Sequence, residues 1–74
     1  MDKPYYVHAD WDDEAKVWVA SSSDVPGLAT EAATAEALIE KLKVLIPELL
    51  ELNGRPTGAP VAFELLSRRY ELAA

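Results

Sequence analysis

The sequence predicts an α+β fold: a two-layer sandwich in the order β-β-β-α-β, with a mainly antiparallel sheet and one kinked helix. Residues 5–11 alternate between apolar and polar side chains, which is the period of a half-buried strand, and residues 16–22 are rich in β-branched and aromatic side chains. From residue 35 the apolar side chains recur every three or four positions, which is the period of an amphipathic helix. Alternation returns at residues 61–65, after a loop at 55–60 that is rich in Pro and Gly. These observations place one helix against one face of a four-stranded sheet.

The first two strands are predicted to form a hairpin. Residues 5–11 make the first strand, and residues 16–22 are β-branched and aromatic enough to make the second. Residues 12–15 between them are polar and few enough to form the hairpin turn. We therefore expect two adjacent antiparallel strands at the start of the chain.

A tight turn is predicted at residues 25–27. Pro26 supplies a φ near −65°, and Gly27 tolerates a positive φ, so the pair is typical of a β-turn. A short third strand, residues 28–32, follows this turn. Pro26 and Gly27 are therefore interpreted as structural residues.

The helix has clear signals at both ends. Thr34 is the best N-cap residue, and Gly54 is placed for the left-handed position after the C-terminus. Pro47 lies inside this stretch, and the carbonyl that its missing N–H leaves free belongs to Lys43. Both residues are expected on the polar side, where water reaches that carbonyl. We predict one kinked helix of about 20 residues, roughly 30 Å long, instead of two helices.

The last strand ends with a change of parity. Residues 61–65 alternate in one phase, whereas Tyr70 and Leu72 follow the opposite phase. Two explanations remain open: a β-bulge near Leu66 and Ser67, or a tail that pairs with another subunit.

One helix leaves the opposite face of the sheet uncovered. We expect that face to carry Trp18 and some of Tyr6, Tyr70 and Leu72. So much exposed aromatic and apolar surface on a small chain predicts a homodimer or a protein partner.

Length and composition predict one globular domain over residues 1–74. The chain has 74 residues, of which 50% are apolar and 27% charged, and it contains no cysteine. Without disulfides or thiolate metal sites, so short a chain depends on helix–sheet packing and self-association. Its start lacks the cationic segment and apolar run of a signal peptide, and no apolar stretch is long enough for a membrane span. The cytoplasm is the expected compartment.

The net charge of −6 is distributed unevenly. Residues 1–40 contain nine carboxylates and two lysines, whereas residues 41–74 contain four carboxylates and five basic side chains. An acidic first half repels phosphate backbones, so direct nucleic-acid binding is disfavoured, and it favours a basic protein partner. The alternative is that the acidity only keeps a small domain soluble.

The sequence contains few groups that could perform catalysis. His8 is the single histidine, and the serines at 21–23 that could act with it lack a nucleophile-elbow motif. Three carboxylates, one from each of three elements, could bind divalent ions as in a nuclease, although no basic cleft accompanies them. They are Asp10, Glu36 or Glu40, and Glu64. We expect no catalytic residue, no cofactor and no metal ion.

Residues 18–28 and 31–38 resemble the signature of the HicB-like antitoxin family. The matching elements are an aromatic-Val-Ala strand at 18–20, an Asp-Val-Pro-Gly turn at 24–27, and a helix that opens Thr-Ala-Glu-Ala-Leu at 34–38. These residue patterns are most similar to those of a stand-alone, uncharacterised subfamily with a domain of unknown function.

The resemblance implies a partial ribonuclease H-like fold without catalysis. It also implies a role in binding and masking HicA, a small basic mRNA ribonuclease, and a tendency to dimerise. The DNA-binding domain that usually follows in such antitoxins is not expected within residues 1–74.

The residues expected to bind a partner are acidic or aromatic. They are Asp10, Asp12, Asp13, Trp18, Asp24, Glu31 and Tyr70. Two other functions stay open: a small-molecule or peptide-binding regulatory domain that uses the face around Trp18, and a metal-dependent nuclease that uses Asp10 and Glu64.

Overall fold

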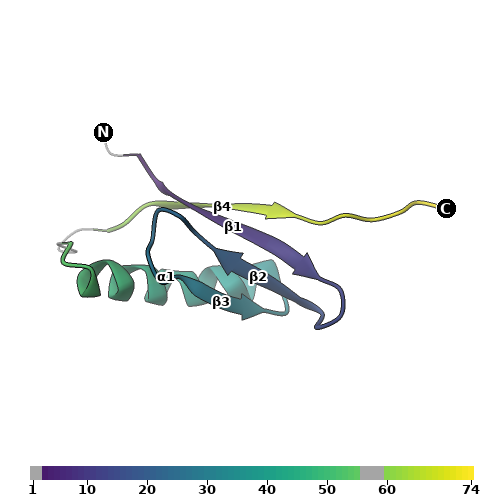
Figure 1. The fold of residues 1–74 in the computed structure, drawn as a ribbon, viewed down its shortest axis with the longest axis horizontal. Helices are drawn as coiled ribbons and strands as arrows, with labels where there is room; N and C mark the ends of the chain where they lie inside the picture. The colour runs from purple at the N-terminus through teal and green to yellow at the C-terminus, as the bar shows by residue number, and fades with distance from the viewer. Residues whose placement is uncertain (1–2, 56–59) are drawn as a thin grey trace.

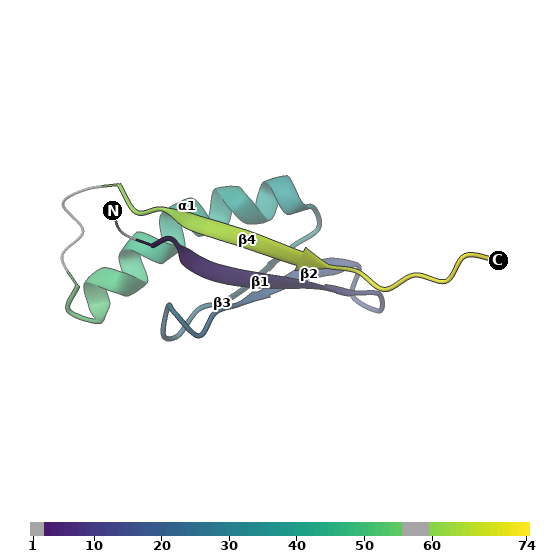
Figure 2. The ribbon, with the colours of Figure 1, turned by 90° about the horizontal axis from the view of Figure 1, so that it is seen from above.

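One helix lies against one face of a four-stranded sheet with the strand order β3-β2-β1-β4 (Figures 1 and 2). The structure is a computed structural model and describes residues 3–55 and 60–74. The elements are β1 (Tyr5–Asp12), β2 (Val17–Ser21), β3 (Ala29–Ala32), α1 (Ala35–Leu52) and β4 (Phe63–Arg68). The predicted α+β class and the order β-β-β-α-β are confirmed. The loop predicted at 55–60 lies mostly outside the described residues.

The sheet is mixed. β1 pairs antiparallel with β2, and β2 pairs antiparallel with β3, as the predicted hairpin requires. β4 instead lies parallel to β1, with Tyr5 opposite Phe63 and Asp10 opposite Arg68. The chain must therefore cross over the sheet between β3 and β4, and α1 makes this connection, as parallel neighbours require.

The core lies between α1 and the inner face of the sheet. Four side chains of α1 are almost fully buried, and their spacing of four residues forms one stripe along the helix: Leu38, Leu42, Ile46 and Leu50. They pack with Val7 and Ala9 of β1 and Ala20 of β2, which are exposed by at most 1%. Each fully buried leucine contributes about 1.5–3 kcal/mol relative to an exposed one.

Both ends of α1 are capped as predicted. The Thr34 hydroxyl accepts a hydrogen bond from the Ala37 N–H at 3.1 Å. At the other end Gly54 has φ +78°, its N–H bonds the Glu51 carbonyl at 3.0 Å, and the Arg55 N–H bonds the Leu50 carbonyl at 2.9 Å. This pair of bonds is a Schellman motif, which ends the helix.

The helix continues through Pro47 as one element, as predicted. The expectation that Pro47 lies on the polar side is wrong, because it is half-buried and lines a hollow with Pro60, Val61 and Phe63. Residues 60 and 61, which lead into β4, pack beside α1 at Pro47. The sequence around Pro47 does not show this contact, because the two segments are brought together only by the tertiary structure.

The turn at residues 25–27 is confirmed. The Leu28 N–H bonds the Val25 carbonyl at 3.2 Å, and Gly27 has φ +84°, as a type II turn requires. The Asn53 side-chain amide donates to the Pro26 carbonyl at 3.3 Å, which ties the turn to the end of α1. Val25 is fully buried, so the turn also closes one end of the core.

The expectation that Trp18 lies on the uncovered face is wrong. Trp18 pairs with Trp11 of β1, packs against the core, and its ring centroid lies 5.3 Å from that of Trp11 in an edge-on arrangement. Ala20, on the same face of β2, is buried opposite Ala9. Trp18 and Ala20 therefore lie on the inward face of β2.

β4 contains no bulge between Phe63 and Arg68, where its register with β1 is unbroken. The strand therefore extends past residues 61–65, and the change of parity is real: Leu66 faces away from α1. Beyond Arg68 the chain runs on as a tail, residues 69–74, past the end of the sheet (Figures 1 and 2). Tyr70 and Leu72 are 85% and 84% exposed on this tail and do not lie on the sheet.

Candidate functional site

The candidate site is the open face of the sheet, which is the face turned away from α1. The strand residues that form it are Tyr6, His8, Asp10 and Asp12 of β1, Val17, Val19 and Ser21 of β2, Ala29 and Glu31 of β3, and Glu64, Leu66 and Arg68 of β4. Apolar side chains on this face are partly exposed: Tyr6 by 41%, Val19 by 42% and Leu66 by 41%. These three side chains give the open face a mixed apolar and polar character.

Acidic side chains dominate the open face. Glu31, Val19, Asp10 and Arg68 form one row across the four strands, with a carboxylate on each side of Val19. Asp12 and Glu64 add two more carboxylates, so the face has four acidic side chains and one guanidinium. Of the expected partner-binding residues, Asp10, Asp12 and Glu31 lie here.

Asp12 also builds the hairpin turn. Its carboxylate accepts hydrogen bonds from the backbone N–H groups of Glu14 and Ala15, both at 3.1 Å. Its carbonyl accepts from the Lys16 N–H at 2.7 Å, and Lys16 adopts a left-handed φ of 59°. The local hydrogen bonds explain why Asp is suited to this position, independently of any partner.

Asp13 is held by its neighbours in the same turn. The Lys16 ammonium donates to its carboxylate at 2.9 Å, and the Trp11 indole N–H donates at 3.3 Å. These contacts, Lys16 first, lower the pKa of Asp13 below its ordinary range, and the charge of Arg69 adds a smaller effect in the same direction.

Asp24 has a structural contact as well. Its carboxylate accepts the backbone N–H of Tyr6 at 2.9 Å, and the Ser22 hydroxyl donates to the Tyr6 carbonyl at 2.5 Å. The same hydroxyl accepts from the N–H groups of Asp24 and Val25. These bonds fasten the loop after β2 to β1, so Asp24 is part of the loop's anchorage.

Sequence reasoning missed a cluster at the end of the sheet. The guanidinium carbon of Arg69 lies 4.2 Å from the centroid of the Trp11 ring, in a cation–π contact, and Arg69 also lies 3.7 Å from the Glu71 carboxylate. A shallow hollow there is lined by Asp10, Trp11, Arg68, Arg69 and Tyr70. The parallel pairing of β1 with β4 brings residues 10 and 11 beside residues 68–70. These segments are far apart in the sequence, so no local sequence pattern predicts the cluster.

The candidate catalytic groups are distributed as follows. His8 and Ser21 are cross-strand neighbours on the open face, with no hydrogen bond between their side chains. Asp10 and Glu64 lie on the open face, whereas Glu36 and Glu40 lie on α1 at the other side of the sheet. Among the described residues, no three side chains of His, Cys, Asp or Glu gather in a way that could hold a metal ion.

No helix in residues 3–55 and 60–74 has both the length and the apolar character needed to cross a membrane.

Comparison with known proteins identifies the family. The model of the DUF1902 family, described as a domain of unknown function, matches residues 4–73. The chain belongs to the DUF1902 family. It is also similar to the crystal structure of hypothetical protein TTHA1013 from the extremely thermophilic bacterium Thermus thermophilus. The two chains are 50% identical, align with a TM-score of 0.73, and match over 97% of this chain and 99% of the other. No curated protein matches the chain.

Proposed function

We propose that this DUF1902 chain is a non-catalytic protein-interaction domain whose open face binds a small basic protein. The observation that carries the proposal is the open face itself, where four carboxylates surround partly exposed apolar side chains. The resemblance of residues 18–38 to HicB-like antitoxins specifies the partner class: a HicA-type mRNA ribonuclease, which the domain would neutralise in the cytoplasm.

The mixture of charged and apolar side chains on the open face supports a protein partner. Apolar side chains within a charged surround reproduce the usual anatomy of an interface, in which the apolar part supplies affinity. The surrounding carboxylates would attract a basic protein and accelerate its association. The row Glu31, Val19, Asp10 is central, because it joins β3, β2 and β1.

The experiment compares two charge-matched double variants in binding to the product of the adjacent reading frame, which the proposal requires to be a small basic ribonuclease. The first is Asp10→Asn with Glu31→Gln on the open face, and the second is Glu48→Gln with Glu51→Gln on α1. We expect the first pair to raise the Kd at least tenfold, which is about 1.4 kcal/mol, and the second to leave it within about twofold. The wild-type Kd should also rise with salt concentration.

Three outcomes would overturn the proposal. They are the absence of a complex with the adjacent reading frame on co-expression, equal effects of the two double variants, and unchanged ribonuclease activity in the complex.

The alternative functions have less support. A small-molecule or peptide-binding role requires an uncovered Trp18, and this side chain packs against the core. A metal-dependent nuclease would need Asp10 and Glu64 to act with the acids of α1, and these lie on different sides of the sheet. Neither alternative has an observation that favours it over a protein partner.

A further inference from the structure

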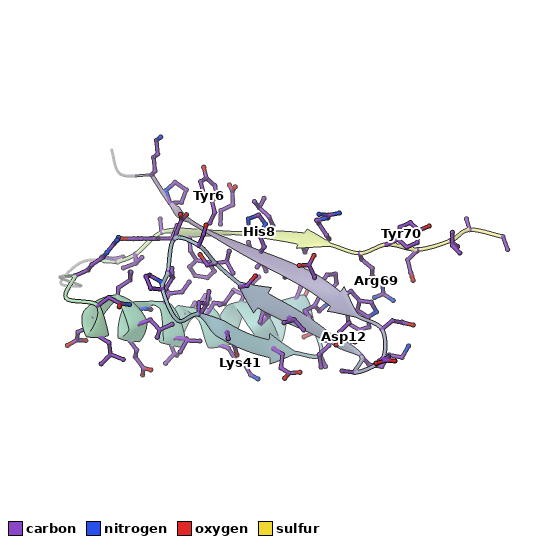
Figure 3. All side chains as sticks on the ribbon, viewed as in Figure 1. Tyr6, His8, Asp12, Lys41, Arg69 and Tyr70 are labelled. Atoms are coloured by element: carbon purple, nitrogen blue, oxygen red, sulfur yellow. The ribbon has the colours of Figure 1, made fainter. Side chains whose placement is uncertain are left out.

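The two edges of the sheet differ in how they are protected. β3 is the edge strand on one side and has four residues. A side chain of α1 bonds its backbone, because the Lys41 ammonium donates to the Glu31 carbonyl at 2.6 Å (Figure 3). A lysine placed at an edge strand blocks the approach of another strand, both by its charge and by using the carbonyl. The Glu31 carbonyl of the β3 edge is therefore occupied, and a lysine stands beside it.

The β4 edge has no such protection among the described residues. The Tyr5 N–H bonds the Ala62 carbonyl, and Tyr5 stands opposite Phe63 in the parallel register. In a parallel pair this geometry directs the N–H and C=O groups of the even-numbered residues of β4 toward β1 and those of the odd-numbered residues outward. Phe63, Leu65 and Ser67 thus present a row of backbone groups at the free edge, and no side chain of the described residues hydrogen-bonds to them.

The tail prolongs this edge. β4 has six residues and the tail another six, so together they span about 40 Å at a strand rise of about 3.3 Å per residue. Leu66, Tyr70 and Leu72 share one parity along this segment and are exposed by 41%, 85% and 84%. An edge with free backbone groups and uncovered apolar side chains is suited to pairing with another strand.

We propose that a second copy of this chain pairs antiparallel along β4, with Leu66 of one copy opposite Leu66 of the other. The two sheets then form one eight-stranded sheet in which β4 lies beside β4 of the partner. This proposal does not depend on the proposed function, because it is carried by the free backbone groups at the β4 edge, although Glu64, Leu66 and Arg68 also belong to the open face.

Backbone geometry and charge favour this register. Opposite residues of an antiparallel pair point to the same face, so even-numbered residues must stand opposite even-numbered ones. Centring the pair on Leu66 places Glu64 opposite the partner's Arg68, twice by symmetry, and pairs all of β4. Centring it on Arg68 would place two guanidinium groups opposite each other, which is unfavourable.

The rest of the fold is compatible with this arrangement. The two-fold axis is perpendicular to the sheet, so both open faces lie on one side and both helices on the other. α1 lies closer to β3 and β2 than to β4, and it contacts the start of β4 where Phe63 lines a hollow with it. The helices therefore lie on the face opposite Leu66 and do not occupy the outer edge of β4. The first part of the tail then runs along residues 60–62 of the partner, which covers Tyr70 and Leu72.

A single-cysteine experiment tests the register, because the native chain has no cysteine. In the proposed dimer residue 66 forms a non-hydrogen-bonded pair with a Cα separation of about 4.5 Å, which suits a disulfide. Under mild oxidation Leu66→Cys should form a disulfide-linked dimer at least tenfold faster than Val44→Cys, an exposed position of α1, or Tyr70→Cys on the tail. Equal rates, or faster linkage at position 70, would overturn the proposed register.

A proline variant tests the pairing itself by sedimentation equilibrium. Ser67→Pro removes an N–H that points to the free edge, so the bonds between β4 and β1 are kept while the edge is blocked. We expect the wild type to be a dimer and Ser67→Pro a monomer with unchanged circular dichroism, whereas Ser67→Ala stays dimeric. A monomeric wild type, or a folded Ser67→Pro dimer, contradicts the proposal. If Ser67→Pro unfolds, the rate ratio of the cysteine variants decides.

Discussion

The two edges of this sheet lie in the same domain and have opposite properties. β3 is short, packs beside α1, and has its Glu31 carbonyl bonded by Lys41. β4 is longer, continues into the exposed tail, and presents free backbone groups along the described part of the chain. Any sheet that is not closed into a barrel has two edges that can bind further strands. Here the helix protects one edge, and the other is left free for a second copy.

The largest effect is expected from a change in the packing of α1 against the sheet, because this packing holds β3 in place. Leu42→Ala leaves a cavity beside Lys41 and should cost about 2–5 kcal/mol of the free energy of unfolding, measured in urea. The amides of Ala29–Ala32 should then exchange with solvent faster, because β3 is held by α1. A cost below about 1 kcal/mol would show that the β3 edge does not depend on this packing.

A charge at the centre of the free edge should dissociate the proposed dimer. Leu66→Lys places two ammonium groups opposite each other and removes the apolar contact, so the dissociation constant should rise at least about 100-fold, or about 2.7 kcal/mol. Since Leu66 is partly exposed within one chain, the folded monomer should be retained. Sedimentation equilibrium measures the effect, and Val44→Lys on α1 serves as the control. Equal effects of both variants would place the contact elsewhere.

Removing the protection of the β3 edge should give a smaller effect. Lys41→Met keeps a flexible apolar chain of similar length but loses the ammonium group and its hydrogen bond to the Glu31 carbonyl. This loss should cost about 0.5–1.5 kcal/mol in the free energy of unfolding. Species larger than a dimer should appear at high concentration, as measured by light scattering. Lys43→Met is the matched control, because Lys43 pairs with Glu40 on the helix surface, at 3.2 Å. Identical scattering from both variants would contradict the protective role.

The smallest effect is expected on the pKa of Asp13, which lies in the hairpin turn between β1 and β2, near Arg69 of the tail. The Lys16 and Trp11 contacts hold the pKa of Asp13 below its ordinary range. A lowered pKa means that the carboxylate stabilises the fold above its ordinary pKa and that this contribution is lost as the pH falls through the lowered value. Lys16→Gln should raise the pKa of Asp13 in an NMR titration, and Arg69→Gln should raise it less. No change with Arg69→Gln would indicate that the tail does not stay beside the hairpin.

Local signals predicted the elements well. The Thr34 cap, the Gly54 end and the turn at Pro26 and Gly27 all act within a few residues, so the sequence alone locates them. The helix period also identified the buried stripe, because each buried position recurs about once per turn.

The errors concern contacts between distant segments. Alternation shows that Trp18 and Ala20 share a face, but only pairing with Trp11 and Ala9 shows that this face is inward. Asp24 was expected to bind a partner, and its bond to the Tyr6 N–H depends on the loop returning to β1. The open-face row around Val19 combines β1, β2 and β3 with Arg68 of β4, so no single segment contains it.

The sequence by itself determined the class of the fold, the limits of the helix, the turn and the acidic character of the first half. These depend on propensities and periods that operate over a few residues. Only the tertiary structure decided which face of each strand is covered, which edge is protected, and that the change of parity after Leu65 is real and not a bulge. Those properties depend on the register between strands far apart in the chain, because a shift of one residue exchanges the two faces of a strand.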